Sequence, residues 1–308
     1  MTAPITELEQ LATWIEAHMR LKDVTLRSWL CSCRDFSDEE FPAWLRNVMN
    51  IVASRRSWRL AEKLLANGGC WILSLRSRCY PQRLACALGE LAPPLLYCRG
   101  NLELFRQPQF AIIGTRRPSA LGRKAARNYA KLLAQHRWVV VSGNARGTDA
   151  IAHEEALTSG GATMVFPPTS LDAFEPAFHW NETWDRCLVA SRYVPGSEIA
   201  AWNFLGRNQL VAAMCRGALV AETGVRGGTL DTVGHLRRLR RPIFVAQLPP
   251  DAKHFRAYEL LRASGACPVP LEPSQNFLQQ LLVSLPGDTP CEETTKPPLD
   301  LFGESSPR

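Results

Sequence analysis

Glycine and arginine residues gather where a short apolar segment ends in the middle of the chain. Gly114-Thr115-Arg116-Arg117 follows Phe110 to Ile113 and precedes a helical pattern that begins at Ala120. A helix N-terminus offers free backbone N–H groups to an anion, glycine permits close approach, and arginine adds charge. The spacing matches neither a dinucleotide-binding motif nor a Walker A motif. It predicts a phosphate site, and a glycine turn with solvated arginines is the alternative.

Three further segments repeat this chemistry. They lie at residues 141–149, 202–208 and 222–232, each next to an apolar or helical stretch. Their candidate phosphate-binding residues are Arg146, Gly147, Asn203, Arg207, Asn208, Gly227, Gly228 and Thr229. Ligands of open parallel sheets bind beyond the carboxyl ends of the strands, so these segments are expected to meet at one sheet edge.

Asp149 and His153 lie one helical turn apart and could form an acid–base pair. Neither a nucleophile nor a second carboxylate accompanies them in sequence, and proton transfer alone does not make a hydrolytic site. Asp149 is better explained as an acid in the first turn of a helix, and His153 as a packing or orienting residue. We therefore predict no catalytic residues and no cofactor.

The elements that must position these residues alternate between apolar runs and helical patterns. The predicted segments are Phe110 to Ile113, Ala120 to His136, Trp138 to Val141, Thr148 to Thr158, Ala162 to Phe166, Leu205 to Met214, Ala218 to Glu222, Leu230 to Leu239 and Ile243 to Gln247. Alternation of strand and helix at this interval is typical of an α/β fold with a Rossmann-like, doubly wound, mostly parallel sheet.

The rest of the chain divides around this core. Residues 1–79 have three-to-four spacing of apolar residues and predict a small N-terminal helical domain. Its tryptophans, among them Trp14 and Trp29, are expected in the core rather than as stacking platforms for bases. Residues 80–268 form a linker and the Rossmann-like domain, and residues 269–308 form a mostly disordered tail.

Charge and composition narrow the class of protein. Thirty-six lysines and arginines against 29 acidic residues give a net charge of +7, which favours a polyanionic partner. The ten cysteines show no metal-ligand spacing, so we expect no metal site and mainly buried, reduced thiols, as around Cys86 and Cys98. Residues 1–9 do not resemble a signal peptide, and no apolar run could span a membrane. A cytoplasmic protein is predicted.

Short motifs recur in a characteristic order between Tyr80 and Val245. They are Tyr80-Pro81, Pro93-Pro94-Leu95-Leu96-Tyr97 with Gly100-Asn101, Gly114-Thr115-Arg116, Ser142-Gly143-Asn144-Ala145-Arg146-Gly147-Thr148-Asp149 with Ala152-His153, Phe204 with Arg207-Asn208, and Gly228-Thr229-Leu230. In this order they resemble the DprA/Smf family of DNA-processing proteins. The resemblance implies a homodimer that binds single-stranded DNA through a basic pocket, helps to load the recombinase RecA, and serves natural transformation or related DNA processing.

Carried over by position, the resemblance places part of the predicted phosphate-binding set in that pocket. Its residues would be Gly114, Thr115, Arg116, Arg146, Arg207, Asn208, Gly227, Gly228 and Thr229. Three departures stand out. Ser191-Arg192 replaces the usual Ser-Glu, Ser197 to Asn203 lacks the usual lysine, and Ser170-Leu171-Asp172 replaces Gly-Leu-Asp. Arg192 is the candidate to supply the missing charge. The C-terminal winged-helix domain of many members also has no room here, so a plasmid-borne or defence-associated paralogue is an equal alternative to a transformation protein.

Two other hypotheses concern particular segments. Leu299, Asp300, Leu301 and Phe302 resemble the peptide that docks in the bacterial sliding clamp, although its glutamine is missing. A nucleotide phosphoribohydrolase of the same Rossmann variant is the enzymatic alternative. That family carries Pro-Gly-Gly-x-Gly-Thr-x-x-Glu, and Val225 to Thr232 lacks both the inner glycine and the glutamate. Single-stranded DNA binding, with recombination mediation as the role, is therefore the favoured function.

Overall fold

A computed structural model describes residues 7–21, 23–32, 40–47, 49–180 and 184–285. The strands are β1 (Trp71–Ser74), β2 (Leu95–Gly100), β3 (Gln109–Gly114), β4 (Val139–Gly143), β5 (Thr163–Phe166), β6 (Cys187–Ser191), β7 (Ala218–Glu222), β8 (Ile243–Ala246) and β9 (Cys267–Val269). The helices are α1 (Glu7–Arg20), α2 (Asp23–Ser32), α3 (Glu40–Asn47), α4 (Arg55–Ala66), α5 (Gln82–Leu88), α6 (Ala120–Gln135), α7 (Thr148–Thr158), α8 (Ala201–Met214), α9 (Gly228–Arg238), α10 (Phe255–Ala263) and α11 (Gln275–Val283).

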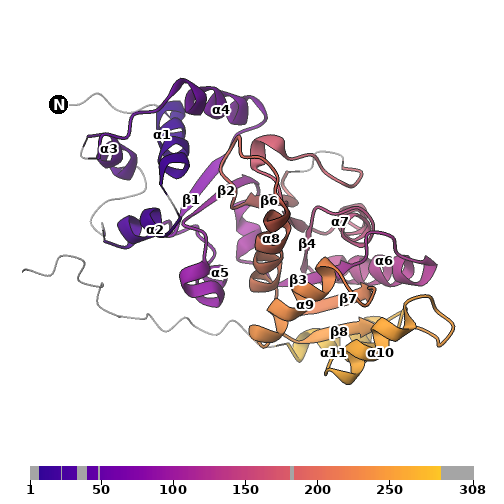
Figure 1. Cartoon of the computed structure of the whole chain (residues 1–308). Helices are drawn as coiled ribbons and strands as arrows, with labels where there is room; N and C mark the ends of the chain where they lie inside the picture. The colour runs from indigo at the N-terminus through magenta and orange to yellow at the C-terminus, as the bar shows by residue number, and fades with distance from the viewer. Residues whose placement is uncertain (1–6, 22, 33–39, 48, 181–183, 286–308) are drawn as a thin grey trace, which may run out of the picture.

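The strands form one sheet in the order β1-β2-β6-β5-β4-β3-β7-β8-β9 (Figure 1). From β6 to β9 every neighbouring pair is parallel, whereas β1 and β2 add an antiparallel end. The chain starts the parallel part at β3, moves outward through β4 and β5 to β6, and returns to the other side of β3 with β7. The order therefore reverses beside β3, which is where doubly wound sheets bind their ligands.

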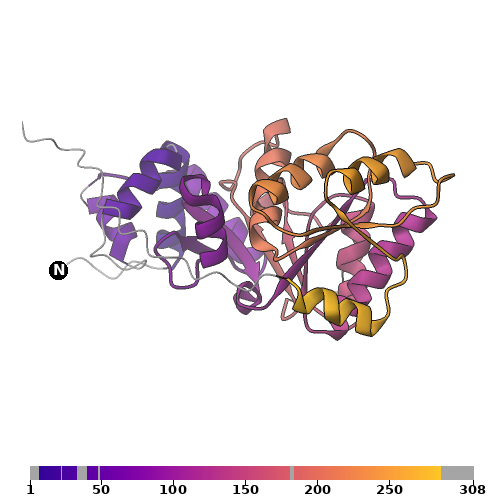
Figure 2. The ribbon, with the colours of Figure 1, turned by 90° about the horizontal axis from the view of Figure 1, so that it is seen from below.

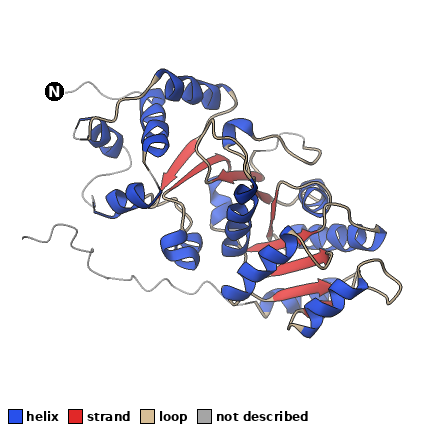
Figure 3. Ribbon diagram, in the orientation of Figure 1, coloured by secondary structure: helices blue, strands red, loops and turns tan. Residues whose placement is uncertain are grey.

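Helices cover both faces of the sheet, as Figure 3 shows with helices in blue around the red strands. On one face, α6, α7 and α11 bury apolar side chains against β3 and its neighbours, with Tyr129 and Phe110 at the centre. On the other face, α5, α8 and α9 pack against the alternate residues of the same strands, such as Ile113 and Val141. Burial on both faces explains why these strands are continuous apolar runs rather than alternating ones.

The N-terminal helices α1 to α4 lie together at the β1–β2 end of the molecule (Figure 2). Their apolar residues share one core with Tyr97 of β2 and Val189 of β6. Trp14 is buried there and stacks on Phe41 with ring centroids 5.2 Å apart. Three other tryptophans of this region pack against the same core, which confirms the prediction that these aromatic residues are structural.

The predicted α/β, Rossmann-like, mostly parallel sheet with preceding helices is confirmed. The limits of its elements differ from the expected ones in detail, and two elements pack against residues beyond the predicted domain limits. β1 lies within residues 1–79 yet pairs with β2, and α11 lies within residues 269–308 yet buries Leu278 and Leu282 against α6. The division into domains stays a prediction.

The cysteines only partly follow the expectation of buried, reduced thiols. Cys98, Cys187 and Cys215 are buried and free, as expected for apolar surroundings, whereas three other free cysteines are exposed. Cys86 lies on the exposed side of α5 and is disulfide-bonded, so the expectation was wrong for this residue. Its alanine-rich context indicated burial, but only the helix phase decides which side faces the core.

Candidate functional site

A cavity of about 380 Å³ opens at the carboxyl ends of β3, β4 and β7, beside the reversal of strand order. The lining residues are Ile113, Gly114, Thr115, Arg116, Gly143, Ala145, Asp149, Phe204, Arg207, Asn208, Val211, Thr223, Gly224, Arg226, Gly227, Gly228, Thr229 and Thr232. The first turn of α9 belongs to this wall, and the N–H groups of a first turn have no partner within the helix. The four predicted segments therefore meet around one cavity.

Two strand-end glycines make room for the residues around the cavity. A Cβ on Gly143 would lie 0.9 Å from Nη1 of Arg207, so the guanidinium occupies the space that any other residue would fill. A Cβ on Gly114 would lie 2.5 Å from the Thr148 hydroxyl oxygen and 2.8 Å from the Glu222 carbonyl oxygen. Here glycine is required by close approach, because neither residue has a positive φ.

Arg207 is held inside the cavity by an ion pair. Its Nη1 lies 3.2 Å from Oδ2 of Asp149, and both side chains are only 8% exposed. Such a pair keeps a charged group in the interior, where an unpaired charge would be costly. Arg207 Nε is also buried and has no hydrogen-bond partner among the described residues. The cavity therefore contains a fixed guanidinium with a donor to spare.

His153 supports this arrangement from behind β4. Its Nε2 lies 2.6 Å from the Gly143 carbonyl oxygen, and its Nδ1 lies 2.6 Å from the Thr163 hydroxyl oxygen. A carbonyl only accepts, so Nε2 of the neutral ring carries the hydrogen. The Thr163 hydroxyl beside Nδ1 also donates to the Val140 carbonyl oxygen, at 2.8 Å. Burial lowers the pKa of His153 to about 4, against smaller opposing effects that include the bond to Gly143. His153 is thus a neutral orienting residue of the β4 end.

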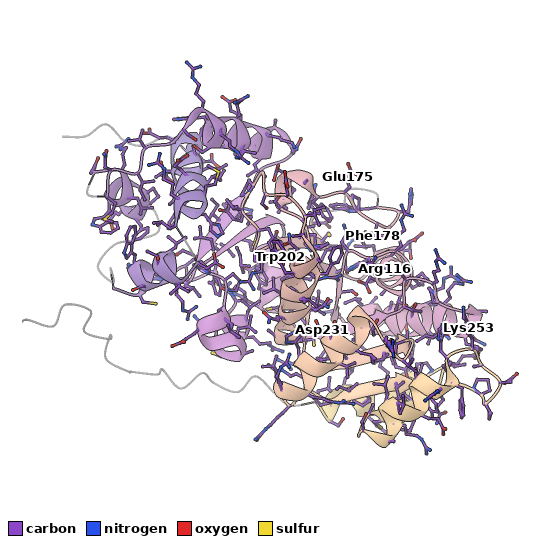
Figure 4. All side chains as sticks on the ribbon, viewed as in Figure 1. Arg116, Glu175, Phe178, Trp202, Asp231 and Lys253 are labelled. Atoms are coloured by element: carbon purple, nitrogen blue, oxygen red, sulfur yellow. The ribbon has the colours of Figure 1, made fainter. Side chains whose placement is uncertain are left out.

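Asn208 has a defined amide orientation. Its Nδ2 donates to the Gly228 carbonyl oxygen at 3.2 Å and to Oδ2 of Asp231 at 3.0 Å. Both partners only accept, so the amide nitrogen must face them and both of its hydrogens are used. The side-chain oxygen is left for a ligand, and it suits a base edge or a water rather than a phosphate. Asp231, which Figure 4 labels on α9, does not line the cavity.

The rim of the cavity carries exposed arginines. Arg116 follows β3, and its guanidinium carbon lies 5.2 Å from the ring centroid of Phe204 on α8. Arg226 lies in the glycine turn between β7 and α9, and it is also exposed. Within the described residues, neither side chain forms an ion pair with an acidic residue, whereas Arg207 in the interior does. Among the lining residues, three arginines stand against one aspartate, so the cavity is positively charged.

The structure brings eight of the predicted phosphate-binding residues to the cavity. They are Gly114, Thr115, Arg116, Arg207, Asn208, Gly227, Gly228 and Thr229. The contact of these residues with a ligand stays a prediction.

The other five predicted residues lie outside the cavity lining. Arg117 and Arg146 are exposed beside it, and Gly147 takes a φ of 83° next to the backbone of Arg116. Asn203 is buried and donates to the Pro168 carbonyl oxygen, at 2.9 Å. Arg192 forms an ion pair of 3.4 Å with Asp23 of α2. The replacement of the missing lysine by Arg192 stays a prediction.

Arg226 is a cavity residue that sequence reasoning left out of the predicted set. Its signal was present, because it lies within the same glycine turn as Gly227 and Gly228. Asp149 and Phe204 were noticed in the sequence for other roles and also line the cavity. Sequence spacing could not show that Asp149 would meet Arg207, which lies 58 positions further along the chain.

Other kinds of site are not apparent in the part of the chain that the structure describes. No three histidine, cysteine or acidic side chains lie together there as metal ligands would. Within the same ranges, no helix has both the length and the apolar character needed to cross a membrane. Leu299, Asp300, Leu301 and Phe302 fall outside the described residues, so the clamp-peptide hypothesis stays a prediction.

Comparisons with known proteins agree on one family. The family model of DNA recombination-mediator protein A matches residues 71–281. The chain is 36% identical over 176 residues to the DNA processing protein DprA of Streptococcus pneumoniae, which covers 56% of this chain and 61% of that protein. The alignment thus spans less than two thirds of this relative.

Solved structures give the same result. The X-ray structure of DprA from Streptococcus pneumoniae has a TM-score of 0.67 and 26% identity, and covers 92% of this chain and 99% of that one. A structure of DNA processing protein A from Helicobacter pylori, described by its single-stranded DNA binding mode, has a TM-score of 0.60 and 28% identity. It covers 70% of this chain and 97% of that one.

Proposed function

The chain belongs to the DNA recombination-mediator protein A family, and from this membership we propose that it binds single-stranded DNA by gripping the phosphate backbone at the strand-end cavity. The observation that carries the proposal is the fixed guanidinium of Arg207. It is buried, paired with Asp149, and retains an Nε donor with no partner among the described residues. Hydrogen bonds from a charged donor to a phosphate oxygen are among the strongest in proteins.

The rim arginines and the N-terminus of α9 complete the proposed phosphate-binding site. Arg116 and Arg226 are exposed and add charge at the mouth, and the first turn of α9 presents backbone N–H groups at Gly228 and Thr229. These groups contact phosphates without reading bases, so little sequence preference is expected. Affinity should fall steeply with salt, because each neutralised phosphate releases counterions.

Fluorescence anisotropy with a labelled oligothymidine, at about 50 and about 200 mM salt, tests the proposal. Arg207→Ala and Arg116→Ala should both weaken binding, and duplex DNA of the same length should bind less well. Arg106→Ala is the matched control, since Arg106 is exposed at the opposite end of β3 and pairs with Glu103. Unchanged affinity in both cavity variants would refute the site.

The role in the cell follows as a further part of the proposal. We propose a cytoplasmic recombination mediator that acts as a homodimer, helps to load RecA on single strands, and works in natural transformation, related DNA processing or defence. Docking on the sliding clamp through residues 299–302 is an additional hypothesis. Pull-down with purified clamp, comparing the wild type with Leu301→Ala plus Phe302→Ala, tests it, and equal capture would refute it.

We propose that the protein acts without catalysis. The phosphoribohydrolase alternative would need an equivalent of that family's motif glutamate at the cavity, and Asp231 is the nearest acid in sequence. In the structure Asp231 accepts a hydrogen bond from the amide of Asn208 and lies 3.5 Å from His235, and it is not one of the residues that line the cavity. Release of a base from a nucleoside monophosphate by the purified protein, abolished by Asp231→Ala, would instead establish the enzyme.

A further inference from the structure

The segment between β6 and α8, residues 192–200, connects two parts of the molecule. We call it the α8 loop. It leads into the helix that carries Phe204, Arg207 and Asn208 to the cavity. Its contacts on one side are with the N-terminal helices, and on the other side with the first turns of α8.

Gly196 is the point at which the N-terminal helices hold the α8 loop. Its N–H donates to Oδ1 of Asp172 at 3.0 Å, and its carbonyl oxygen accepts from Nη2 of Arg56 on α4 at 3.0 Å. Both polar groups of the peptide backbone of this residue are therefore bound. The φ of 75° favours glycine, and a Cβ there would lie only 3.0 Å from the side chain of Leu60.

Asp172 joins this contact to α4 a second time. Its Oδ2 lies 3.6 Å from Nζ of Lys63, and the aspartate side chain is only 6% exposed. At the start of the loop, Arg192 pairs with Asp23 of α2 at 3.4 Å. Two N-terminal helices thus contact the loop directly, through Arg56 of α4 and Asp23 of α2. A third, indirect connection runs from Lys63 of α4 through Asp172 to Gly196.

Tyr193 transmits the position of the loop to α8. Its hydroxyl donates to the carbonyl oxygen of Asn203 at 2.6 Å, in the first turn of the helix. The ring end fits against Gly206, where a Cβ would lie 2.7 Å from the hydroxyl oxygen. Burial raises the pKa of Tyr193, so the hydroxyl stays protonated as a donor.

The first turn of α8 has little support of its own. Its N-cap is Ala200, which makes no side-chain capping bond, and the turn contains no acidic residue to complement the helix dipole. By contrast, α6 is capped by the hydroxyl of Ser119, and α4 by that of Ser54. The Tyr193 bond therefore anchors this turn at a carbonyl oxygen, which is a different contact from the capping of free N–H groups.

We propose that the N-terminal helical domain positions the cavity face of α8 through the α8 loop, with Asp172 and Arg56 as positioning residues. This inference rests on the proposed function for its effect on DNA. When the bonds to Gly196 are lost, the loop and the first turn of α8 move more freely, and Phe204 and Arg207 spend less time in the binding arrangement. The apparent affinity for DNA is then reduced in proportion to the fraction of molecules in the binding-competent arrangement. The number of phosphate contacts stays the same.

Asp172→Ala and Asp172→Asn separate the role of the backbone bond from that of the charge. Asp172→Ala removes both contacts and should weaken binding of a labelled oligothymidine about five- to ten-fold, with an unchanged salt slope. Asp172→Asn keeps an acceptor for Gly196 and should recover most of the affinity. Arg20→Ala is the matched control, because Arg20 pairs with Glu16 within α1 and does not touch the loop.

Arg56→Ala and Arg56→Lys form a second pair that leaves the carboxylate of Asp172 in place. Arg56→Ala should weaken binding in the same way, and Arg56→Lys should restore it in part. If either alanine variant does not fold, the other pair carries the test.

Hydrogen exchange of the free protein separates this positioning role from global stability. In the Asp172→Ala variant, amides of residues 201–206 should exchange faster, while those of β3 and β4 keep the wild-type rate. Equal exchange in α8 and equal DNA affinity in both alanine variants would overturn the inference. Wild-type protein that binds no single-stranded DNA would refute the proposed function instead, and faster exchange in α8 would still support the positioning of this helix.

Discussion

Arg207 and Arg116 line the same cavity but are held in different ways. Arg207 is buried, passes over Gly143 and is paired with Asp149, so the fold places it before any ligand arrives. Arg116 is exposed at the rim, and its guanidinium lies over the ring of Phe204. The interior arginine is therefore part of the structure, and the rim arginine contributes mainly charge.

This difference separates two kinds of contribution to binding. A preorganised interior group loses little conformational entropy when a phosphate arrives, but its removal damages the protein itself. A rim group must be ordered on binding and is screened by salt, but its removal leaves the fold intact. The variants below change one contribution at a time.

Arg207→Ala is expected to have the largest effect. It leaves Asp149 buried without its partner, and loss of one member of a buried pair costs about 3 to 5 kcal/mol of unfolding free energy. Urea denaturation monitored by circular dichroism measures it. The double variant Asp149→Asn plus Arg207→Ala should recover part of the loss. An Arg207→Ala protein as stable as the Arg116→Ala protein would remove the distinction between interior and rim.

The dependence of stability on pH tests the buried residues of the site in a second way. The pKa of His153 in the folded protein is about 4, below the unfolded value near 6.5, so between these values the unfolded chain binds more protons. The stabilisation that neutral His153 contributes is fully present above pH 6.5. As the pH falls toward 4, the unfolding free energy decreases by about 3 kcal/mol in total. Urea midpoints across this range measure the loss. The His153→Gln variant cannot titrate and should show a smaller dependence on pH.

Gly143→Ala introduces a methyl group where the Arg207 guanidinium lies. The expected cost is about 1 to 3 kcal/mol of stability, as for other overpacked sites, together with weaker DNA binding because Arg207 is displaced. Ala145→Gly is a useful control, since it changes a cavity residue without adding volume. Normal DNA affinity in Gly143→Ala would show that the position of Arg207 is not critical.

Arg116→Ala and Arg226→Ala should have the smallest effect on stability and a clear effect on salt dependence. Each should change the unfolding free energy by less than about 0.5 kcal/mol, because both side chains are exposed. Each should reduce the slope of log affinity against log salt by about 0.7, the value for one phosphate of a single strand. Anisotropy titrations at several salt concentrations measure the slope. A slope identical to that of the wild type would exclude these residues as phosphate contacts.

Much of the architecture was accessible from sequence patterns. The apolar run at 218–222 and the helix at 148–158 were predicted with the limits that the structure has, because both are bounded by glycine or by a cap-like residue. The strand β6 was missed, since Cys187 to Ser191 follows an aromatic loop without the regular alternation of strand and helix. β1 and β2 were missed as strands because both lie before the regular alternation of strand and helix, and β2 directly follows Pro93-Pro94.

Some features of the candidate site could likewise be predicted from the sequence, and others could not. Types and spacing of residues determined that glycine turns and arginines follow the strands, because backbone approach and charge are local requirements. The tertiary structure decided which of those residues share a cavity. It brought Arg226 to the mouth, took Asn203 to the Pro168 carbonyl, and paired Arg192 with Asp23.

Local residue patterns were thus sufficient to predict the fold class, the family motifs and the chemistry at the strand ends. The pairing and burial of each charged group depend on residues far apart in sequence. These properties were therefore known only from the folded chain. The meeting of Asp149 with Arg207 and the contacts of α4 with the α8 loop are of this kind. Local sequence patterns determine the propensity for helices, strands and turns. Packing between residues far apart in sequence determines which hydrogen-bond donors remain free to bind a ligand.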